Sequence, residues 1–217
     1  MTIHDISLPV RKDSPSWPGK SPLLLRDTQN LSRGDACTAR TMTMDIHLGT
    51  HLDAPAHFVF GGLTIDQVPL TTVLGPCRVV EFADSFDSEI PPDVLEGCDS
   101  ERVLFKTRNS DLLSRPDFDP HFVALSEALA RELVKNRVCL VGIDYFSVDS
   151  FDSTKRAVHH ILLESGTVIL EGINLSAIAA GDYYLVALPL NLVGAEGSPV
   201  RALLIDFDPR QGQSAER

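Results

Sequence analysis

Short hydrophobic runs dominate this chain, and their pattern predicts more strands than helices. Between Thr41 and His47 the alternation is strict: Met42, Met44 and Ile46 occupy one face and polar residues the other. A period of two is typical of a half-buried strand. The other predicted strands are runs rich in Val, Ile, Leu and aromatic residues. They cover residues 22–25, 79–82, 102–106, 138–143, 167–170, 183–188 and 200–207.

Two segments have helical character. Residues 126–135 follow a leucine pattern of four-residue spacing, and Lys135 suits a helix C-terminus. A second helix is predicted over residues 154–165, with Gly166 as its left-handed cap. Strands outnumber helices, and the sequence contains no G-x-G-x-x-G or P-loop motif that would indicate a nucleotide-binding fold. We therefore predict one mixed α/β domain over residues 1–217, strand-rich with few helices.

Composition narrows the function classes. The chain is 43% hydrophobic and 23% charged, as in globular proteins, and its formal net charge is −11. Such a charge argues against nucleic acid or an anionic membrane as a partner. No apolar run reaches the ~20 residues of a membrane span, and the first residues do not resemble a signal peptide. We expect a cytoplasmic protein.

The cysteines carry no metal-binding or disulfide pattern, because they are scattered and form no C-x-x-C pair. We expect reduced, mostly buried thiols. These residues are Cys37, Cys77, Cys98 and Cys139.

Candidate chemistry concentrates in one segment, since three of the seven histidines lie within residues 47–57. His47, His51, Asp53 and His57 all occupy odd positions, so an extended chain would direct them to one face. The glycine and proline between them argue against a helix. We expect a strand that ends near His47 and continues into a shaped loop.

Imidazole and carboxylate groups in this arrangement indicate a catalytic metal site. They are suitable ligands for zinc, manganese or iron, and a hydrolytic site also needs an open position for water. An isolated histidine such as His4 or His121 is more simply read as a hydrogen-bonded structural residue. Four such groups in phase favour the metal site over that interpretation.

The pattern His-x-Gly-Thr-His-x-Asp-x-Pro-x-His resembles the motif of the cyclase family of metal-dependent amidohydrolases. That family includes bacterial kynurenine formamidases (arylformamidases) and isatin hydrolases. Further resemblance lies in Trp-Pro-Gly at 17–19, in Gly-Ile-Asp-x-x-Ser-x-Asp at 142–149, and in residues 62–69, 169–175 and 197–201. The resemblance implies the family's strand-rich swivelling β/β/α-like fold and is strongest to the formamidase branch.

The resemblance also implies site residues. His47, His51 and Asp53 would bind a first metal, and Asp53 would bridge to a second one held by His159 and Glu171. His57 would act as general acid and base, and Trp17 would contact the substrate. Assignment of His159 rather than its neighbour His160 rests on the family's spacing to Gly166, because residue types alone leave both open.

Other residues of the matching blocks are open to two interpretations. Tyr145, Ser147 and Asp149 could stabilise a turn or serve the site. Asp144 could support a metal ligand from behind. Phe58 and Phe60 are expected to line the substrate pocket or the adjoining core.

The expected activity is hydrolysis of an N-formyl aryl amine such as N-formylkynurenine, with two zinc ions per subunit or manganese in their place. The family also implies a homodimer or a higher homo-oligomer. Two alternatives stay open at this point: hydrolysis of a cyclic amide, as by isatin hydrolase, and a metal-binding regulatory protein without turnover. Lys20 departs from the formamidase branch, which usually has an acidic residue there.

Overall fold

A computed structural model describes residues 1–83 and 88–206, and a nine-stranded sheet dominates it. The four strands β5, β7, β9 and β10 run parallel, while the strands outside them pair antiparallel. This confirms the predicted strand-rich, mixed α/β class. In spatial order the strands are β1 (Ile3–Asp5), β13 (Leu203–Asp206), β11 (Gly181–Val186), β5 (Leu74–Glu81), β7 (Arg102–Lys106), β9 (Leu140–Ile143), β10 (Val168–Glu171), β4 (His51–Asp53) and β12 (Gly197–Pro199).

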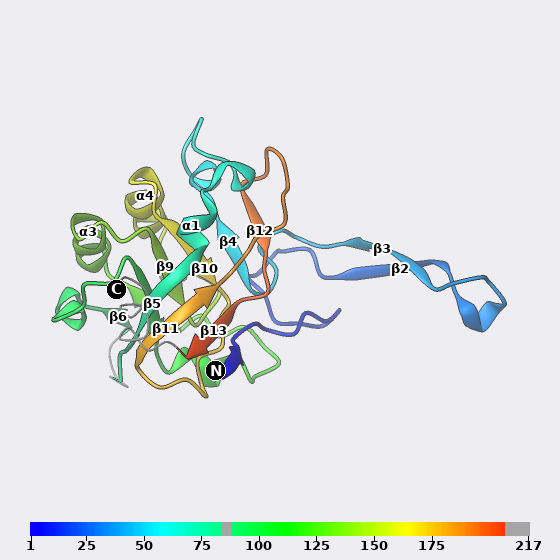
Figure 1. Cartoon of the computed structure of the whole chain (residues 1–217), viewed down its shortest axis with the longest axis horizontal. Coiled ribbons are helices and arrows are strands. Elements are labelled where there is room, and N and C mark those ends of the chain that lie inside the picture. Colours follow the sequence, from blue (N-terminus) through cyan, green and yellow to red (C-terminus); the bar gives the residue numbers. More distant parts are fainter. Residues whose placement is uncertain (84–87, 207–217) are drawn as a thin grey trace, which may run out of the picture.

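Two helices pack against each other on one side of this sheet, α3 (Glu127–Lys135) and α4 (Ala157–Glu164) (Figure 1). The side chain of Ser126 caps α3 by accepting a hydrogen bond from the backbone N–H of Leu129. Gly166 follows α4 with a positive φ of 87°, as a left-handed cap requires. Both predicted helices are confirmed, each slightly shorter than its pattern.

The parallel strands are buried on both faces, because each neighbouring pair is joined by a crossover that must pass over the sheet. Successive residues therefore enter two different cores. Leu52, Leu104 and Leu170 belong to one core, whereas Phe105 and Ile169 belong to the other, together with α3 and α4. By the same alternation, the residues on either side of Leu52 face the helical side.

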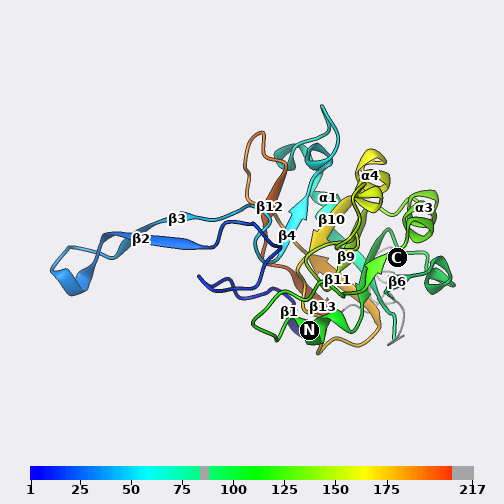
Figure 2. The same cartoon turned by 180° about the vertical axis from the view of Figure 1, so that it is seen from behind.

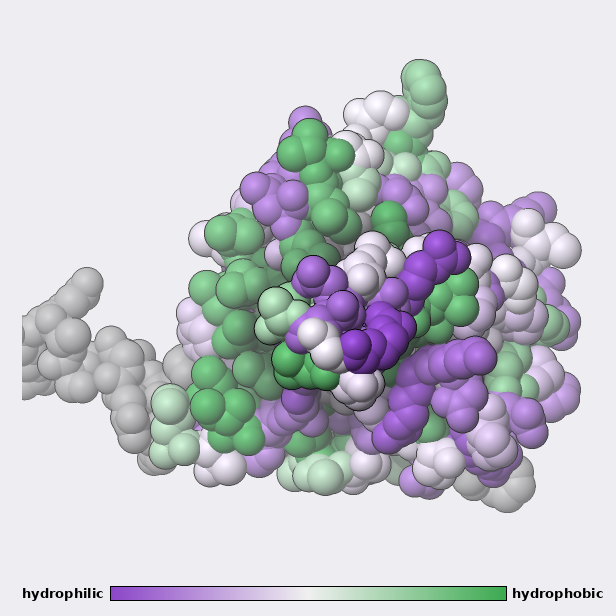
Figure 3. Space-filling model, turned by 90° about the vertical axis from the view of Figure 1, so that its right-hand side faces the viewer, coloured by the Kyte–Doolittle hydropathy of each residue, from purple (hydrophilic) through white to green (hydrophobic). Residues whose placement is uncertain are grey.

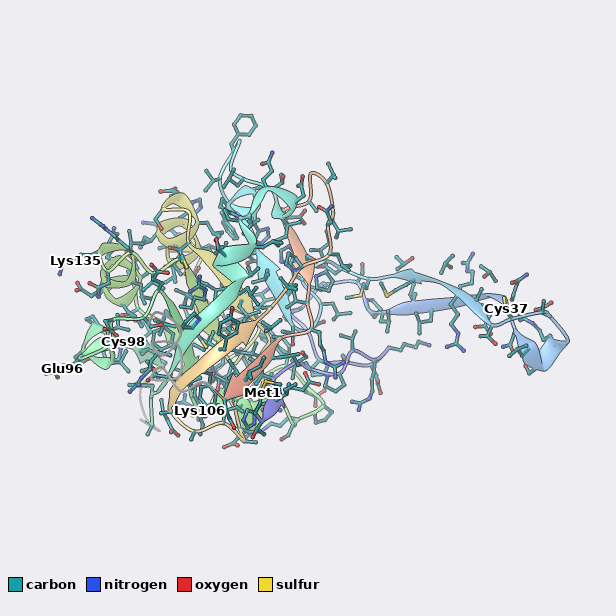
Figure 4. All side chains as sticks on the ribbon, viewed as in Figure 1. Met1, Cys37, Glu96, Cys98, Lys106 and Lys135 are labelled. Atoms are coloured by element: carbon teal, nitrogen blue, oxygen red, sulfur yellow. The ribbon has the colours of Figure 1, made fainter. Side chains whose placement is uncertain are left out.

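A two-stranded arm projects from this body (Figures 1 and 2). It consists of β2 (Leu24–Gln29) and β3 (Ala39–Thr43), joined through the 3-10 turn Leu31–Arg33. Figure 4 shows Cys37 near its far end. The half-buried strand predicted from Thr41 to His47 is therefore wrong: β3 stops at Thr43, and Met42 is 58% exposed. Its alternation reflects a ribbon on the outside of the body, not one face of a core.

The remaining elements are short. They are α1 (Leu70–Val73), α2 (Asn109–Leu112), the parallel pair β6 (Glu89–Ile90) and β8 (Ala124–Leu125), and the 3-10 turns Pro55–His57, Ile65–Gln67 and Pro92–Leu95. The strand predicted over 200–207 is observed only as β13, and Phe207 lies outside the described residues.

The four cysteines are free thiols, but only Cys77 is buried and Cys37 is exposed, so the expectation of mostly buried thiols is wrong. Within the described ranges, no helix is long and apolar enough to cross a membrane.

Candidate metal centre

The first part of the site comes from β4 and the turn before it. His51 and Asp53 alternate with Leu52, so both face the helical side of the sheet, and both are almost completely buried. His47 comes from the preceding turn, and its Nδ1 lies 2.7 Å from Asp53 Oδ1. The histidine motif therefore begins in a turn and enters the sheet at His51, and does not leave a strand at His47 as expected.

Strand register places Glu171 beside this group. In the antiparallel pair of β10 and β4, Glu171 is directly opposite His51. Directly opposed residues have adjacent side chains on the same face, and Glu171 Oε2 lies 3.4 Å from His51 Nε2. Its other oxygen accepts a hydrogen bond of 2.8 Å from the backbone N–H of Val148. This hydrogen bond fixes the carboxylate of Glu171, the last residue of the buried strand β10.

The crossover helix α4 supplies the last member. It joins the parallel neighbours β9 and β10 and passes over the face that His51, Asp53 and Glu171 share. His159 is 5% exposed, and its Nε2 lies 3.6 Å from Asp53 Oδ2 and 3.3 Å from Glu171 Oε1. The adjacent His160 points elsewhere, with its Nδ1 3.2 Å from Glu164.

These residues form two groups that share one carboxylate: His47 with His51 and Asp53, and Asp53 with His159 and Glu171. Donors about 2.0–2.1 Å from one tetrahedral zinc lie about 3.3 Å from each other. Several of the separations above are 3.3–3.6 Å. Two adjacent cations with Asp53 between them would satisfy this spacing.

The fit to a metal is supported by unsatisfied atoms. Among the described residues, three buried side-chain atoms lack a hydrogen-bond partner, and all belong to this cluster: His47 Nε2, His51 Nε2 and Asp53 Oδ2. A buried polar atom without a partner costs about 1–3 kcal/mol. Cations at these positions would satisfy all three atoms, so the donor set suits zinc or manganese.

Mutual interactions shift the pKa values within the cluster. Burial alone would lower the pKa of His159, but hydrogen bonds to Asp149 and Glu171 and the nearby carboxylates raise it to about 10. Burial opposes ionisation of Asp53, yet the neighbouring histidines hold its pKa well below the usual range. Negative charge is therefore stabilised at the carboxylate that the two groups share, where cations would need it.

His57 occupies a different position. Its ring stacks on His47, with centroids 4.1 Å apart, and it lies in the short 3-10 turn after β4. Burial lowers the pKa of His57, and the charges of His47 and His159 act in the same direction. A neutral imidazole beside the cluster can accept a proton.

The cluster opens into a cavity of about 240 Å³ with aromatic walls. Trp17, Phe58 and Phe146 line it, and Phe58 stacks on His159 at a centroid distance of 4.7 Å. Trp17 also packs against Phe118 and two other phenylalanines, so it contributes to a core and to the pocket. The structure thus brings every residue predicted for the site to one cavity or to the cluster beneath it.

Two expectations about surrounding residues need correction. Phe60 is fully exposed and lines neither pocket nor core. Asp144 supports no ligand: it accepts hydrogen bonds from Thr107 and Ser110. The carboxylate behind the candidate ligand His159 is that of Asp149, whose Oδ2 lies 2.5 Å from His159 Nδ1.

Sequence reasoning missed two charged residues near the cavity. Glu196 Oε1 lies 3.4 Å from His47 Nε2, and with His47 and His57 it forms a third group able to hold a cation. Arg156 lines the cavity from the residue before α4. Neither residue stands in a recognisable motif, and only the fold brings them to the site.

The Cyclase family matches residues 4–150. A kynurenine formamidase of Bacillus thuringiensis subsp. konkukian (strain 97-27) is 36% identical over 92% of this chain and 95% of its own length. Another, from Salinibacter ruber, is 36% identical over 95% of this chain and 98% of its own. The chain belongs to the Cyclase family, and the resemblance seen in its motifs is confirmed.

Solved structures agree with this assignment. A potential metal-dependent hydrolase with cyclase activity superposes with a TM-score of 0.81 at 31% identity, covering 96% of this chain and 99% of that one. Isatin hydrolase A from Labrenzia aggregata gives a TM-score of 0.80 at 23% identity, over 95% and 94% of the two chains. At that identity the second comparison establishes the shared fold alone.

Proposed function

We propose that this protein is a kynurenine formamidase, a metal-dependent hydrolase that converts N-formylkynurenine and water to kynurenine and formate. The observation that carries the proposal is the pair of ligand groups sharing Asp53 at the base of an aromatic cavity, with His57 beside them. Relatives of that name, 36% identical over nearly the whole chain, support the substrate class.

His47, His51 and Asp53 would hold one ion, and Asp53, His159 and Glu171 a second, with zinc proposed for both. When bound, the metal would polarise the formyl carbonyl and lower the pKa of a water molecule towards neutrality. The chain's own residues account for the remaining requirements of the reaction.

His57 would provide proton transfer. Its lowered pKa keeps the imidazole neutral, so a ring nitrogen can accept a proton from the attacking water and return it to the departing aniline nitrogen. Trp17, Phe58 and Phe146 would hold the aryl ring and limit access of bulk water. The formyl carbonyl would then be attacked next to His57, the acid and base that completes the reaction.

Cyclic-amide hydrolysis is the second candidate because the same cluster could attack a ring amide. Isatin hydrolases share the fold at 18–23% identity, well below that of the formamidases. A regulatory protein without turnover is less well supported, because the cluster offers more ligands than one structural ion needs and opens into a cavity.

One assay on purified protein tests these alternatives. Metal content is measured by elemental analysis, and turnover is measured on N-formylkynurenine and isatin in parallel. We expect two zinc ions per chain and a higher kcat/KM for the formamide. Preference for isatin would support the second candidate, and bound metal without turnover of either substrate would support the third.

The proposal includes a homodimer built through the arm. In the described part of the chain, β2 and β3 pair only with each other, and an isolated two-stranded ribbon is marginally stable in water. Leu24, Leu25 and Met42 on the arm are all more than half exposed. Figure 3 faces the side from which the arm projects and shows hydrophobic groups on the body beside it. A second copy of the chain would cover both the exposed hydrophobic residues of the arm and the hydrophobic groups of the body beside it.

Light scattering tests the dimer. We expect wild-type protein to have twice the mass of the chain, and Leu25→Asp with Met42→Asp to shift it towards monomer. A monomeric wild type would contradict this part of the proposal.

For the cellular setting we propose the cytoplasm, where the four free thiols would stay reduced.

A further inference from the structure

Two cationic side chains line the cavity of a chain whose net charge is −11. Arg156 comes from the residue before α4, and Lys20 from the turn that begins at Trp17. Attack on a neutral formamide group needs neither of them. Their presence next to aromatic walls indicates that the cavity accepts a ligand with negative charge.

Arg156 is fixed in place without being neutralised. Its Nη1 donates a hydrogen bond of 2.9 Å to the carbonyl of Ser150, and its guanidinium carbon lies 4.8 Å from the centroid of the Trp17 ring. No carboxylate among the described residues pairs with it. The guanidinium therefore keeps its full charge and several N–H donors beside the ring that would contact an aryl substrate.

Lys20 is held by the turn at the start of the arm. Its backbone N–H bonds to the carbonyl of Trp17, with Pro18 and Gly19 between them and a φ of 90° at the glycine. The ammonium group lies 3.4 Å from Asp45 Oδ1, which neutralises part of its charge. Lys20 adds a positive field to the cavity, but Arg156 is the better anion-binding group.

We propose that Arg156 binds a carboxylate on the substrate and makes the enzyme selective for aryl formamides whose side chain carries a carboxylate. The inference rests on the proposed formamidase function and extends it to a specificity-determining residue. A planar guanidinium matches a carboxylate in two parallel hydrogen bonds. N-formylkynurenine carries such a group on the side chain next to its formamide, so Trp17 and Arg156 would contact its ring and its carboxylate together.

Three substrates distinguish the effect of the carboxylate from that of the reacting group. They are N-formylkynurenine, its methyl ester, and 2-formamidoacetophenone, which lacks the amino-acid side chain. All three contain the same aryl formamide. For wild-type enzyme we expect kcat/KM to fall about 10- to 100-fold from the acid to the ester, as for loss of one hydrogen-bonded charge pair. This comparison needs no variant.

Variants then assign the effect to Arg156. Arg156→Gln should lose the preference for the acid, with a fall in kcat/KM about 10-fold or more greater on the acid than on 2-formamidoacetophenone, and Arg156→Lys should retain part of the preference. Arg131→Gln is the matched control, since Arg131 is an exposed residue of α3 paired with Glu127. It should keep the wild-type preference.

Each contrary result has a separate meaning. Equal rates of wild-type enzyme on acid and ester would overturn the anion subsite and leave the formamidase function intact. An equal loss on all three substrates in Arg156→Gln would assign Arg156 a structural role and overturn the inference as well. Failure of wild-type enzyme on every aryl formamide would overturn the proposed function and this inference with it.

Discussion

Asp149 holds His159 by its side chain and by its backbone at once. Asp149 Oδ2 lies 2.5 Å from the ring Nδ1 of His159 and accepts a hydrogen bond of 3.1 Å from its backbone N–H. Its other oxygen accepts the backbone N–H of Val158. One carboxylate therefore caps the first turn of α4 and fixes the ring so that Nε2 faces Asp53 and Glu171. Metal-binding histidines commonly have such a partner.

Removing this carboxylate should weaken one of the two proposed metal positions. In Asp149→Ala we expect about 10- to 100-fold lower affinity at the His159 position, with partial recovery in Asp149→Asn. Elemental analysis after dialysis against graded chelator measures both positions. Asp182→Ala, which removes a surface ion pair with Arg78, is the control and should keep both ions. Equal loss at both positions, together with a lower Tm, would indicate general destabilisation instead.

Neighbouring histidines on α4 provide a matched pair. His159 reaches the cluster, whereas the side chain of His160 is 44% exposed and pairs with Glu164. We expect His159→Ala to lose one metal ion and nearly all turnover, and His160→Ala to keep both ions. Metal content and kcat are measured on the same preparations. A metal-depleted His160→Ala would contradict the assignment.

His57→Ala should separate catalysis from metal binding. If His57 transfers protons, the variant keeps both ions and loses about 100- to 10,000-fold in kcat. His121→Ala is the control, because His121 is exposed and distant in sequence from the motif. The structure also offers the alternative in which His57 binds a cation with His47 and Glu196. Loss of metal from His57→Ala would support that arrangement and contradict the acid–base role.

Gly172 is expected to be intolerant of any side chain. It has a φ of 69°, and a Cβ there would collide with the backbone carbonyl of Gly49, between His47 and His51. We expect Gly172→Ala to lower the free energy of unfolding several-fold more than Gly166→Ala does. Gly166 also has a positive φ, but a Cβ added there would meet no atom within 4 Å. The control should cost only about 1–2 kcal/mol. Urea unfolding compares them, and equal losses would contradict the close approach.

The buried carboxyl group of Asp144 is expected to make the free energy of unfolding depend on pH. Burial raises its pKa from 3.8 to about 6, despite the hydrogen bonds from Thr107 and Ser110. The folded state then binds the proton more tightly, so the contribution is complete below pH 3.8 and is lost as the pH rises through about 6. The full difference corresponds to about 3 kcal/mol.

The Asp144→Asn variant lacks this titration and isolates it. We expect the free energy of unfolding of wild-type protein, minus that of the variant, to decrease between pH 4 and 6. Urea unfolding of both proteins, each freed of metal, measures this difference. A difference that increases with pH would show that the donors around Asp144 favour its ionised form over the protonated one.

Sequence patterns predicted the parallel core and its helices well, because these elements are long enough for their period to be read. Residues 102–106 coincide with β7, and α3 begins one residue after the start predicted at Ser126. The pattern failed at Thr41–His47, where alternation alone could not distinguish a core strand from an exposed arm. It also missed β4, whose three residues are too few to show a period.

The candidate site was predictable in part for a similar reason. His47, His51, Asp53 and His57 lie close together in sequence, so their residue types were informative without a fold. Glu171 joins them only through the register of β10 with β4, and without the family resemblance it would pass for an ordinary surface carboxylate. The orientation of Arg156 follows from tertiary structure alone.

The position of β4 has a consequence for how the protein reaches its native state. This strand is bordered by β10 and β12, both more than a hundred residues later in the chain. Contacts between such distant segments form late, because long loops must close first. We therefore expect His51 and Asp53 to meet Glu171 only after most of the sheet has assembled. A metal ion would then select the finished fold and slow its unfolding, without guiding the early steps of folding.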